Sequence, residues 1–193
     1  MTANSTFETF LHCVINDTSL HPHIPEIITT FSQIKLSKNE FFVASGSICK
    51  HFCYIETGVL QHSLVVLEEE KTTYLALKNS CTASLNSFKN SVPSRKSIKA
   101  ITDCSLLVIT IQEFEYLMEH NQAFYTFYYN LIENQIYKID DHRIDLLTLS
   151  PEDRYQKLLQ NEPTLLQKVP LHYLASFLGI SLRHMSRIRK NIK

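Results

Sequence analysis

The stretch LHYLASFLGISLRHMSRIRKNIK, residues 171–193, carries the most informative pattern of the chain. Counted from its first leucine, small Ala175 is fifth, Gly179 is ninth and apolar Met185 is fifteenth. This is the spacing of a helix-turn-helix, in which a small residue lets the second helix cross the first closely. Glycine enters the positive φ of the turn at little cost, and Ser181 stands where the second helix needs a cap. The pattern therefore predicts a DNA-binding element.

The second helix of this element is basic, although the chain as a whole is neutral. The sequence has 19 Lys and Arg against 19 Asp and Glu, yet no acid lies beyond Ser181. The basic residues there are Arg183, Arg187, Arg189, Lys190 and Lys193. Charge alone would also fit a solvated basic helix, but together with the turn it favours contact with DNA phosphates and bases.

Helical periodicity divides this helix into two faces. We expect Leu182, Met185 and Ile188 to point inward. The side chains expected to read bases are Arg183, His184 and Arg187. Those expected to contact phosphates are Ser181, Arg189 and Lys190. Arginine suits the first task because it can donate two hydrogen bonds to guanine O6 and N7 in the major groove.

Composition places the chain among soluble globular proteins. With 193 residues, 44% of them hydrophobic, it can form one sizeable domain and a small one. No apolar run reaches membrane-spanning length, and the N-terminus lacks the charged start of a signal peptide. The cysteines are dispersed and form no CxxC pair, which predicts reduced thiols in the cytoplasm. They are Cys13, Cys49, Cys53, Cys81 and Cys104.

Residues 34–110 read as a series of short strands separated by polar turns or glycines, which predicts a small β-sandwich or barrel. From Ile111 onward the pattern is helical, and residues 111–153 hold nine acids and two bases. One helix is expected to run from about Ala123 to Leu147 with an apolar stripe. That stripe fits either packing on the β domain or a dimer seam.

A further helix is expected to begin at Ser150-Pro151, where serine suits the cap and proline the first turn. Residues 161–167 are expected to form a short connector to the helix-turn-helix.

The order of β domain, long helix and helix-turn-helix resembles the Crp/Fnr family of bacterial transcription regulators, over nearly the whole chain. The most specific stretches are SPEDRYQKLLQNEPTLLQKVP and LASFLGISLRHMSRIRK. They are similar to those of the short members common in the Bacteroidetes group. Ser186 and Arg187 match the family pattern in the recognition helix, whereas Arg183 replaces an acid. The resemblance thus adds Ser186 to the DNA-contacting set and implies a different preference for DNA sequence.

The resemblance implies an α+β fold in three parts. Residues 1–120 would form an antiparallel β-roll of the cyclic-nucleotide-binding type, residues 121–148 a dimerisation helix, and residues 149–193 the helix-turn-helix. The chain ends too soon after the recognition helix for the β-hairpin wing of most members, so we expect no wing. The implied function is that of a cytoplasmic, homodimeric regulator that binds double-stranded DNA, with RNA polymerase as a further candidate partner.

The effector site departs from that of cyclic-AMP-binding relatives, which use a glutamate for the ribose and an arginine for the cyclic phosphate. Ser84 stands where that glutamate would be, and Ser94 where that arginine would be. A buried cyclic phosphate without a charged partner is costly, so we expect no response to cyclic AMP. The residues expected around any effector pocket are Ser84, Leu85, Asn86, Ser94 and Arg95. A pocket with these residues is compatible with binding a different ligand or with binding no ligand at all. The side chain of Arg95 is compatible with contacting an anion or with lying in solvent at a basic edge.

Other chemistry finds little support in the sequence. His12, Cys13, His21 and His23 lack metal-ligand spacing, the cysteines lack the clustering of an iron–sulfur site, and haem has no motif. No phosphate loop, GxSxG or HExxH motif is present, and strand alternation separates Cys53 from Glu56. We therefore expect neither an enzyme nor a bound cofactor or metal. The alternative to a DNA-binding regulator is a ligand- or protein-binding signalling module with a vestigial DNA-binding end.

Overall fold

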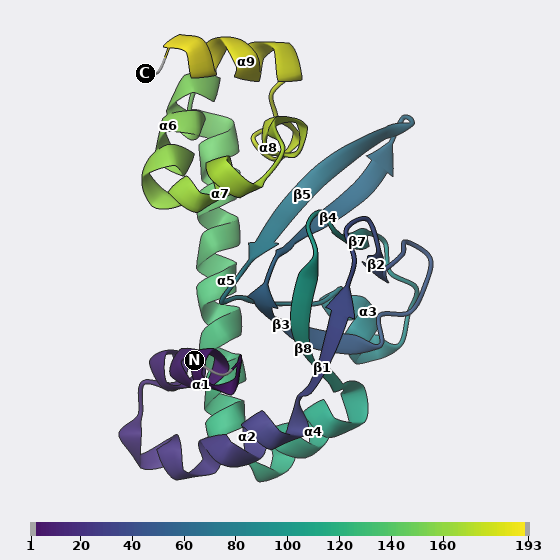
Figure 1. The fold of residues 1–193 in the computed structure, drawn as a ribbon, viewed down its shortest axis with the longest axis vertical. Coiled ribbons are helices and arrows are strands. Elements are labelled where there is room, and N and C mark those ends of the chain that lie inside the picture. The colour runs from purple at the N-terminus through teal and green to yellow at the C-terminus, as the bar shows by residue number, and fades with distance from the viewer. Residues whose placement is uncertain (1–2, 192–193) are drawn as a thin grey trace.

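The computed structural model describes residues 3–191 of the chain; Lys193, one of the basic residues noted above, lies outside them. A long helix runs through the molecule, with a β-roll along its middle and helices gathered at both ends (Figure 1). The elements follow in this order: α1 (Ala3–Ile15), a 3-10 helix η1 (Thr18–His23), α2 (Ile24–Thr30), β1 (Ser32–Leu36), β2 (Phe41–Val43), β3 (His51–Thr57), β4 (Val59–Val66), β5 (Glu69–Leu77), β6 (Cys81–Thr82), α3 (Leu85–Asn90), β7 (Ser97–Ala100), β8 (Cys104–Thr110), α4 (Ile111–His120), α5 (Gln122–Thr148), α6 (Pro151–Asn161), α7 (Pro163–Lys168), α8 (Leu171–Phe177) and α9 (Leu182–Asn191).

The β-roll consists of two antiparallel sheets with strand orders β1-β8-β3-β6 and β2-β7-β4-β5. Its inner faces pack apolar side chains with almost no solvent exposure, such as Ile55, Leu60 and Ile98. The strands predicted in residues 34–110 are all present. Neighbouring residues of a strand point to opposite faces, and in β3 and β4 five consecutive residues are buried, so both faces of these two strands are covered. The α+β class with an antiparallel β-roll is confirmed.

The turn between β3 and β4 depends on glycine. Gly58 has φ +95°, and a Cβ added there would lie 2.5 Å from the carbonyl oxygen of Asp103. A side chain at this position would therefore push β3 and β4 away from the segment that leads into β8.

The burial of apolar side chains on helix α5 differs between its beginning and its end. Its cap is Asn121, whose side chain accepts a hydrogen bond from the amide of Phe124. In the first turns, Phe124 and Phe127 are fully buried in the core of the β-roll. Further on, Ile136 and Ile139 are more than half exposed. One side of the first half therefore packs on the β domain, and exposed apolar side chains remain along the rest of the helix, so the interpretation of the stripe as a dimer seam stays a prediction.

The N-terminal helices, which the sequence did not predict, surround the first half of α5 (Figure 1). Asn130 of α5 donates a side-chain hydrogen bond to the carbonyl group of Val14 at 2.9 Å. Asn121 likewise donates to the carbonyl group of His23 at 3.0 Å. These contacts fix α1 and η1 against the long helix.

The C-terminal helices α6–α9 form the head, a name we keep for residues 151–191. The connector expected at residues 161–167 is wrong, because α7 (Pro163–Lys168) is helical: its proline suits the first turn, and Leu165 is buried. The head shares one apolar core with the outer face of the β-roll, which contributes Val59, Leu75 and Ile101. The ends of α4 and α5 lie at the expected domain borders, but because of this common core the division into three domains stays a prediction.

Within residues 3–191, no helix is both long enough and apolar enough to cross a membrane.

Candidate nucleic-acid interface

The predicted helix-turn-helix is formed by α8, the turn at Gly179 and α9. Ala175 of α8 is 2% exposed where the two helices meet, and its carbonyl group accepts a hydrogen bond from the amide of Ile180 at 2.9 Å. Gly179 has φ +68°. The turn thus uses the small residue and the glycine in the way that the sequence spacing predicted.

Ser181 caps α9. Its hydroxyl oxygen accepts a hydrogen bond from the amide of His184 at 3.2 Å. Met185 and Ile188 are buried and set which face of α9 turns inward. The prediction that Leu182 also points inward is wrong: it is half exposed, because it lies in the first turn about a quarter turn away from the buried side.

The outward face of α9 is basic. Arg183, Arg187, Arg189 and Lys190 are exposed, and among residues 3–191 no carboxylate forms an ion pair with any of them. The hydroxyl group of Ser186 donates to the carbonyl group of Leu182 at 2.9 Å, which holds it on the helix. Four cations that no carboxylate of residues 3–191 neutralises create a positive surface on one short helix, which attracts phosphate groups.

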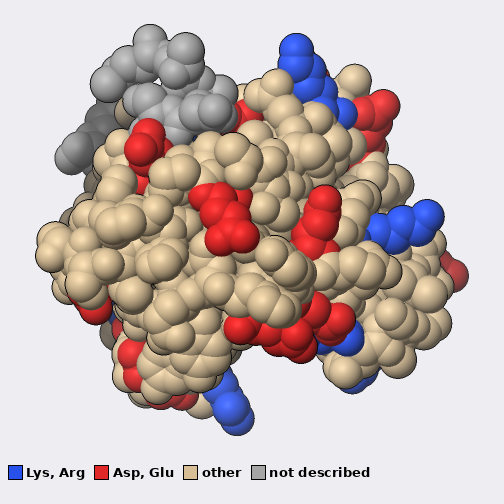
Figure 2. Space-filling view, turned by 90° about the horizontal axis from the view of Figure 1, so that it is seen from below, with Lys and Arg blue, Asp and Glu red and all other residues tan. Residues whose placement is uncertain are grey.

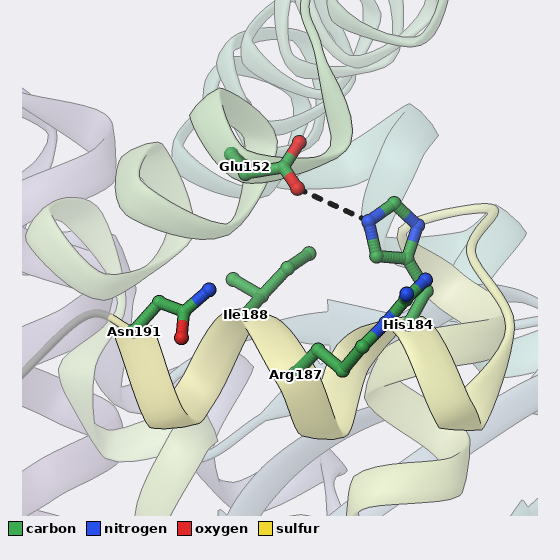
Figure 3. A pocket seen from close by; sticks show the side chains of 5 residues that line it. All are labelled: Glu152, His184, Arg187, Ile188 and Asn191. Carbon is green, nitrogen blue, oxygen red and sulfur yellow. Dashed lines mark hydrogen bonds and ion pairs between the residues drawn. The ribbon is translucent and has the colours of Figure 1, made fainter.

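His184 lies elsewhere than expected. It is placed on the flank of α9 that faces α6, and its Nε2 atom lies 3.0 Å from Oε1 of Glu152 (Figure 3). The two residues, together with Arg187, Ile188 and Asn191, line an open cleft of about 260 Å³. The pKa of the Glu152 carboxyl group is lowered, first by a hydrogen bond from its own backbone amide and then by His184. No sequence signal marks this pair, because 32 residues separate its members.

The end of the molecule farthest from α9 has the opposite character. Seen from below, carboxylates are spread over this face and basic side chains appear mainly at its edges (Figure 2). Exposed acids of α2 and α4 lie in this region: Glu26, Glu113, Glu115 and Glu119. The neutral net charge of the chain thus separates into a basic head and an acidic opposite end.

Of the five residues expected around an effector pocket, two lie side by side in the structure. Ser84 and Ser94 are buried, and their hydroxyl oxygens lie 2.7 Å apart. The oxygen of Ser94 also lies 2.6 Å from the carbonyl oxygen of Lys96. Leu85 packs against the core, whereas Asn86 and Arg95 are exposed. Arg95, the only charged residue among these five, is therefore exposed to solvent and does not lie buried beside Ser84 and Ser94.

Neighbouring polar groups that the sequence did not single out lie inside the same β-roll. His62 is 2% exposed, and its Nε2 atom lies 2.8 Å from the hydroxyl group of Thr82. Burial holds the pKa of His62 well below its usual value of 6.5, and the nearby Lys96 adds to the effect. Desolvation also lowers the pKa of Lys96. Burial thus disfavours positive charge on both groups in the present structure.

The residues considered for a metal site do not assemble into one. The rings of His12 and His21 meet edge to face with centroids 4.1 Å apart, while Cys13 and His23 are exposed. Over the described part of the chain, no three His, Cys, Asp or Glu side chains come close enough to hold a metal ion.

Comparison with known proteins shows which proteins have a similar fold. Residues 33–121 match the family described as the cyclic nucleotide-binding domain. The structure of FixK2 from Bradyrhizobium japonicum is 13% identical with a TM-score of 0.71, and the match covers 84% of each chain. CLP from Xanthomonas campestris, described as a c-di-GMP-responsive global regulator, is 15% identical with a TM-score of 0.68, over 89% of this chain and 90% of that one.

A protein of the crp/fnr family from Eubacterium rectale is 15% identical with a TM-score of 0.65, over 91% of this chain and 82% of that one. No curated protein sequence matches the chain. The resemblance inferred from the sequence is thus confirmed at the level of the fold. Residues 33–121 match the cyclic nucleotide-binding domain family, and the chain as a whole has the Crp/Fnr-type fold.

Proposed function

We propose that the protein is a homodimeric, sequence-specific DNA-binding transcription regulator of the Crp/Fnr type, working in the cytoplasm. The observation that carries this proposal is the outward face of α9, where Arg183, Arg187 and Lys190 are exposed and form no ion pair with any carboxylate of residues 3–191, on a helix fixed by a helix-turn-helix turn. The regulators named above share the fold, which supports the same role.

In this proposal α9 enters the major groove. Arg183 and Arg187 lie one helical turn apart on the outward face and reach base edges, where guanine offers two acceptors. Ser181, Arg189 and Lys190 contact phosphates at the ends and edge of the helix, and Ser186 lines the same face. His184 contacts DNA from the flank. The acidic opposite end turns away from DNA, because phosphates repel it (Figure 2).

The dimer forms along α5. Exposed apolar side chains recur there at steps of three and four residues, which is the spacing of a helix-pairing seam: Tyr125, Tyr129, Ile136 and Ile139, with Ile132 partly exposed between them. Two α5 helices paired along this seam would present two α9 helices to successive half-sites. A single head would bind DNA weakly, and pairing supplies the missing contacts.

The β-roll does not fit cyclic AMP. A cyclic phosphate needs a positive partner, but the position expected for an arginine holds Ser94, which is bound to Ser84 at 2.7 Å. Arg95 is exposed, and burial disfavours the charged form of Lys96. We infer that the protein binds DNA without cyclic AMP. RNA polymerase is a candidate partner of the DNA-bound dimer.

Selection of random duplex DNA by the purified, ligand-free protein tests the proposal. The matched control is the Arg183→Ala/Arg187→Ala variant, which removes both arginines expected to contact bases but no buried group. We expect a two-fold symmetric motif that the control does not enrich. If an intact wild-type dimer enriches no motif with or without small-molecule extracts, the protein is not a sequence-specific DNA reader, and a signalling module with a vestigial head is the better description.

A further inference from the structure

The pair formed by Glu152 and His184 connects two helices of the head at the edge of the DNA-facing surface. Glu152 is in the first turn of α6, and His184 is in the first turn of α9. Their Oε1 and Nε2 atoms are 3.0 Å apart, while their side chains remain 51% and 32% exposed. The contact is therefore too open to serve mainly as core packing.

The chemistry of the pair fixes where the imidazole proton lies. The carboxyl group of Glu152 is ionised at neutral pH, and a hydrogen bond from its own backbone amide lowers its pKa further; an ionised carboxylate only accepts hydrogen bonds. The Nε2 atom of His184 must then carry a proton. In a neutral imidazole the other nitrogen, Nδ1, consequently has a free lone pair and acts as an acceptor.

The acceptor nitrogen lies on the side of the ring opposite the bond to Glu152 (Figure 3). Nδ1 points away from Glu152 (Figure 3), and Arg187 lines the same cleft as His184. An arginine and an acceptor nitrogen next to each other form a mixed recognition surface. Guanine presents acceptors to the arginine, whereas the amino groups of adenine (N6) and cytosine (N4) are the major-groove donors.

We propose that Glu152 is a positioning residue that holds His184 in its Nε2–H form, so that Nδ1 selects an adenine or cytosine next to the base read by Arg187. The inference rests on the proposed function, since it assigns a specificity to the same interface. It gives His184 the base-reading role expected from the sequence, but through a tautomer that the sequence could not reveal.

The first experiment measures the tautomer in the free protein. The full-length chain is labelled with ¹⁵N-histidine, and the His184 signals are identified among its nine histidines with the His184→Gln variant. At pH 8, where imidazoles are mostly neutral, we expect one Nε2–H tautomer for His184. Glu152→Gln should give a tautomer mixture, because an amide both donates and accepts. An Nδ1–H form in the wild type, or no change in Glu152→Gln, overturns the proposal.

The second experiment repeats the DNA selection at pH 8 with Glu152→Gln. The wild type should enrich adenine or cytosine at one position of each half-site, next to a guanine. Glu152→Gln should lose about fivefold discrimination at that position, which corresponds to one hydrogen bond, and keep the guanine. Asp153→Asn is the matched control: it removes a neighbouring charge that contacts Ser150 rather than His184, and it should keep the complete motif.

The outcomes separate the two proposals. An unchanged motif in Glu152→Gln overturns the role of Glu152 but leaves the DNA-binding function standing. A wild type that enriches no motif overturns the proposed function and, with it, the base contact of His184. Loss of the complete motif in both Glu152→Gln and Asp153→Asn shows a general charge effect and also overturns the positioning role.

Discussion

The backbone amide of Thr72 in β5 donates a hydrogen bond to the hydroxyl oxygen of Ser176 in α8 at 2.8 Å. This bond joins residues 104 positions apart and connects the β-roll directly with the head. Around it, Val59 and Leu75 of the β-roll pack with Leu174 of α8 in one core. The orientation of the head is therefore set by the outer face of β4 and β5 as well as by α5.

Removal of this hydrogen bond should loosen the head. Ser176→Ala leaves the amide of Thr72 without its partner, which should lower the free energy of unfolding by about 1–2 kcal/mol. Hydrogen exchange at the Thr72 amide should become faster. Thr29→Ala is a suitable control, because the exposed Thr29 hydroxyl only bonds the carbonyl group of Glu26 within its own helix. Equal exchange of Thr72 in Ser176→Ala and the wild type would contradict this account.

Two glycines with similar backbone angles should respond differently to alanine. Gly46 has φ +86° with no atom within 4 Å of an added Cβ, whereas Gly58 has φ +95° and meets the Asp103 carbonyl oxygen at 2.5 Å. Gly46→Ala should cost only the backbone strain of about 1–2 kcal/mol. Gly58→Ala should cost clearly more, as measured by urea unfolding. Similar midpoints for the two variants would show that the β3–β4 turn relaxes freely.

The open stripe of α5 should control assembly. Ile136→Glu places a charge in the proposed seam, and we expect sedimentation analysis to show monomers. Tyr137→Glu is the matched control, because both side chains are 58% exposed but Tyr137 lies off the stripe. A dimer that survives Ile136→Glu and dissociates in Tyr137→Glu would place the interface on a different face of the helix.

Phosphate and base contacts should differ in their dependence on salt. Lys190→Gln should weaken binding to all DNA sequences and reduce the slope of log affinity against log salt by about 1. Arg187→Ala should instead remove the preference for the specific site, with fold and dimer retained. If specific and random DNA bind Arg187→Ala with the same affinity ratio as the wild type, Arg187 does not read bases.

Acid should destabilise the β-roll through His62. Burial holds the pKa of His62 well below 6.5 in the native protein, whereas the unfolded chain takes up a proton as pH falls below 6.5. The unfolded state then binds more protons, so the free energy of unfolding decreases as pH falls below 6.5, by up to about 1.4 kcal/mol per pH unit. His62→Leu should reduce this slope between pH 6.5 and 5. An unchanged slope would assign the acid sensitivity to other groups.

Local patterns in the sequence determined much of the architecture. The strands of the β-roll, the long helix and the helix-turn-helix follow from alternation, helical periodicity and the residues at Ala175, Gly179 and Ser181. Such features depend on neighbours a few residues away, and therefore the chain reveals them directly. The basic face of α9 could be read in the same way, although the exposed position of Leu182 could not.

Only the tertiary structure decided how these parts meet. The bond from Thr72 to Ser176, the pair of Glu152 and His184, and the packing of α1 and α2 on α5 all join segments far apart in the chain. No periodicity encodes such contacts, because they arise from the shapes of surfaces that exist only after the elements have formed. The sequence thus determined the elements and the basic chemistry of α9, and the folded chain decided which side chains hold that helix in place.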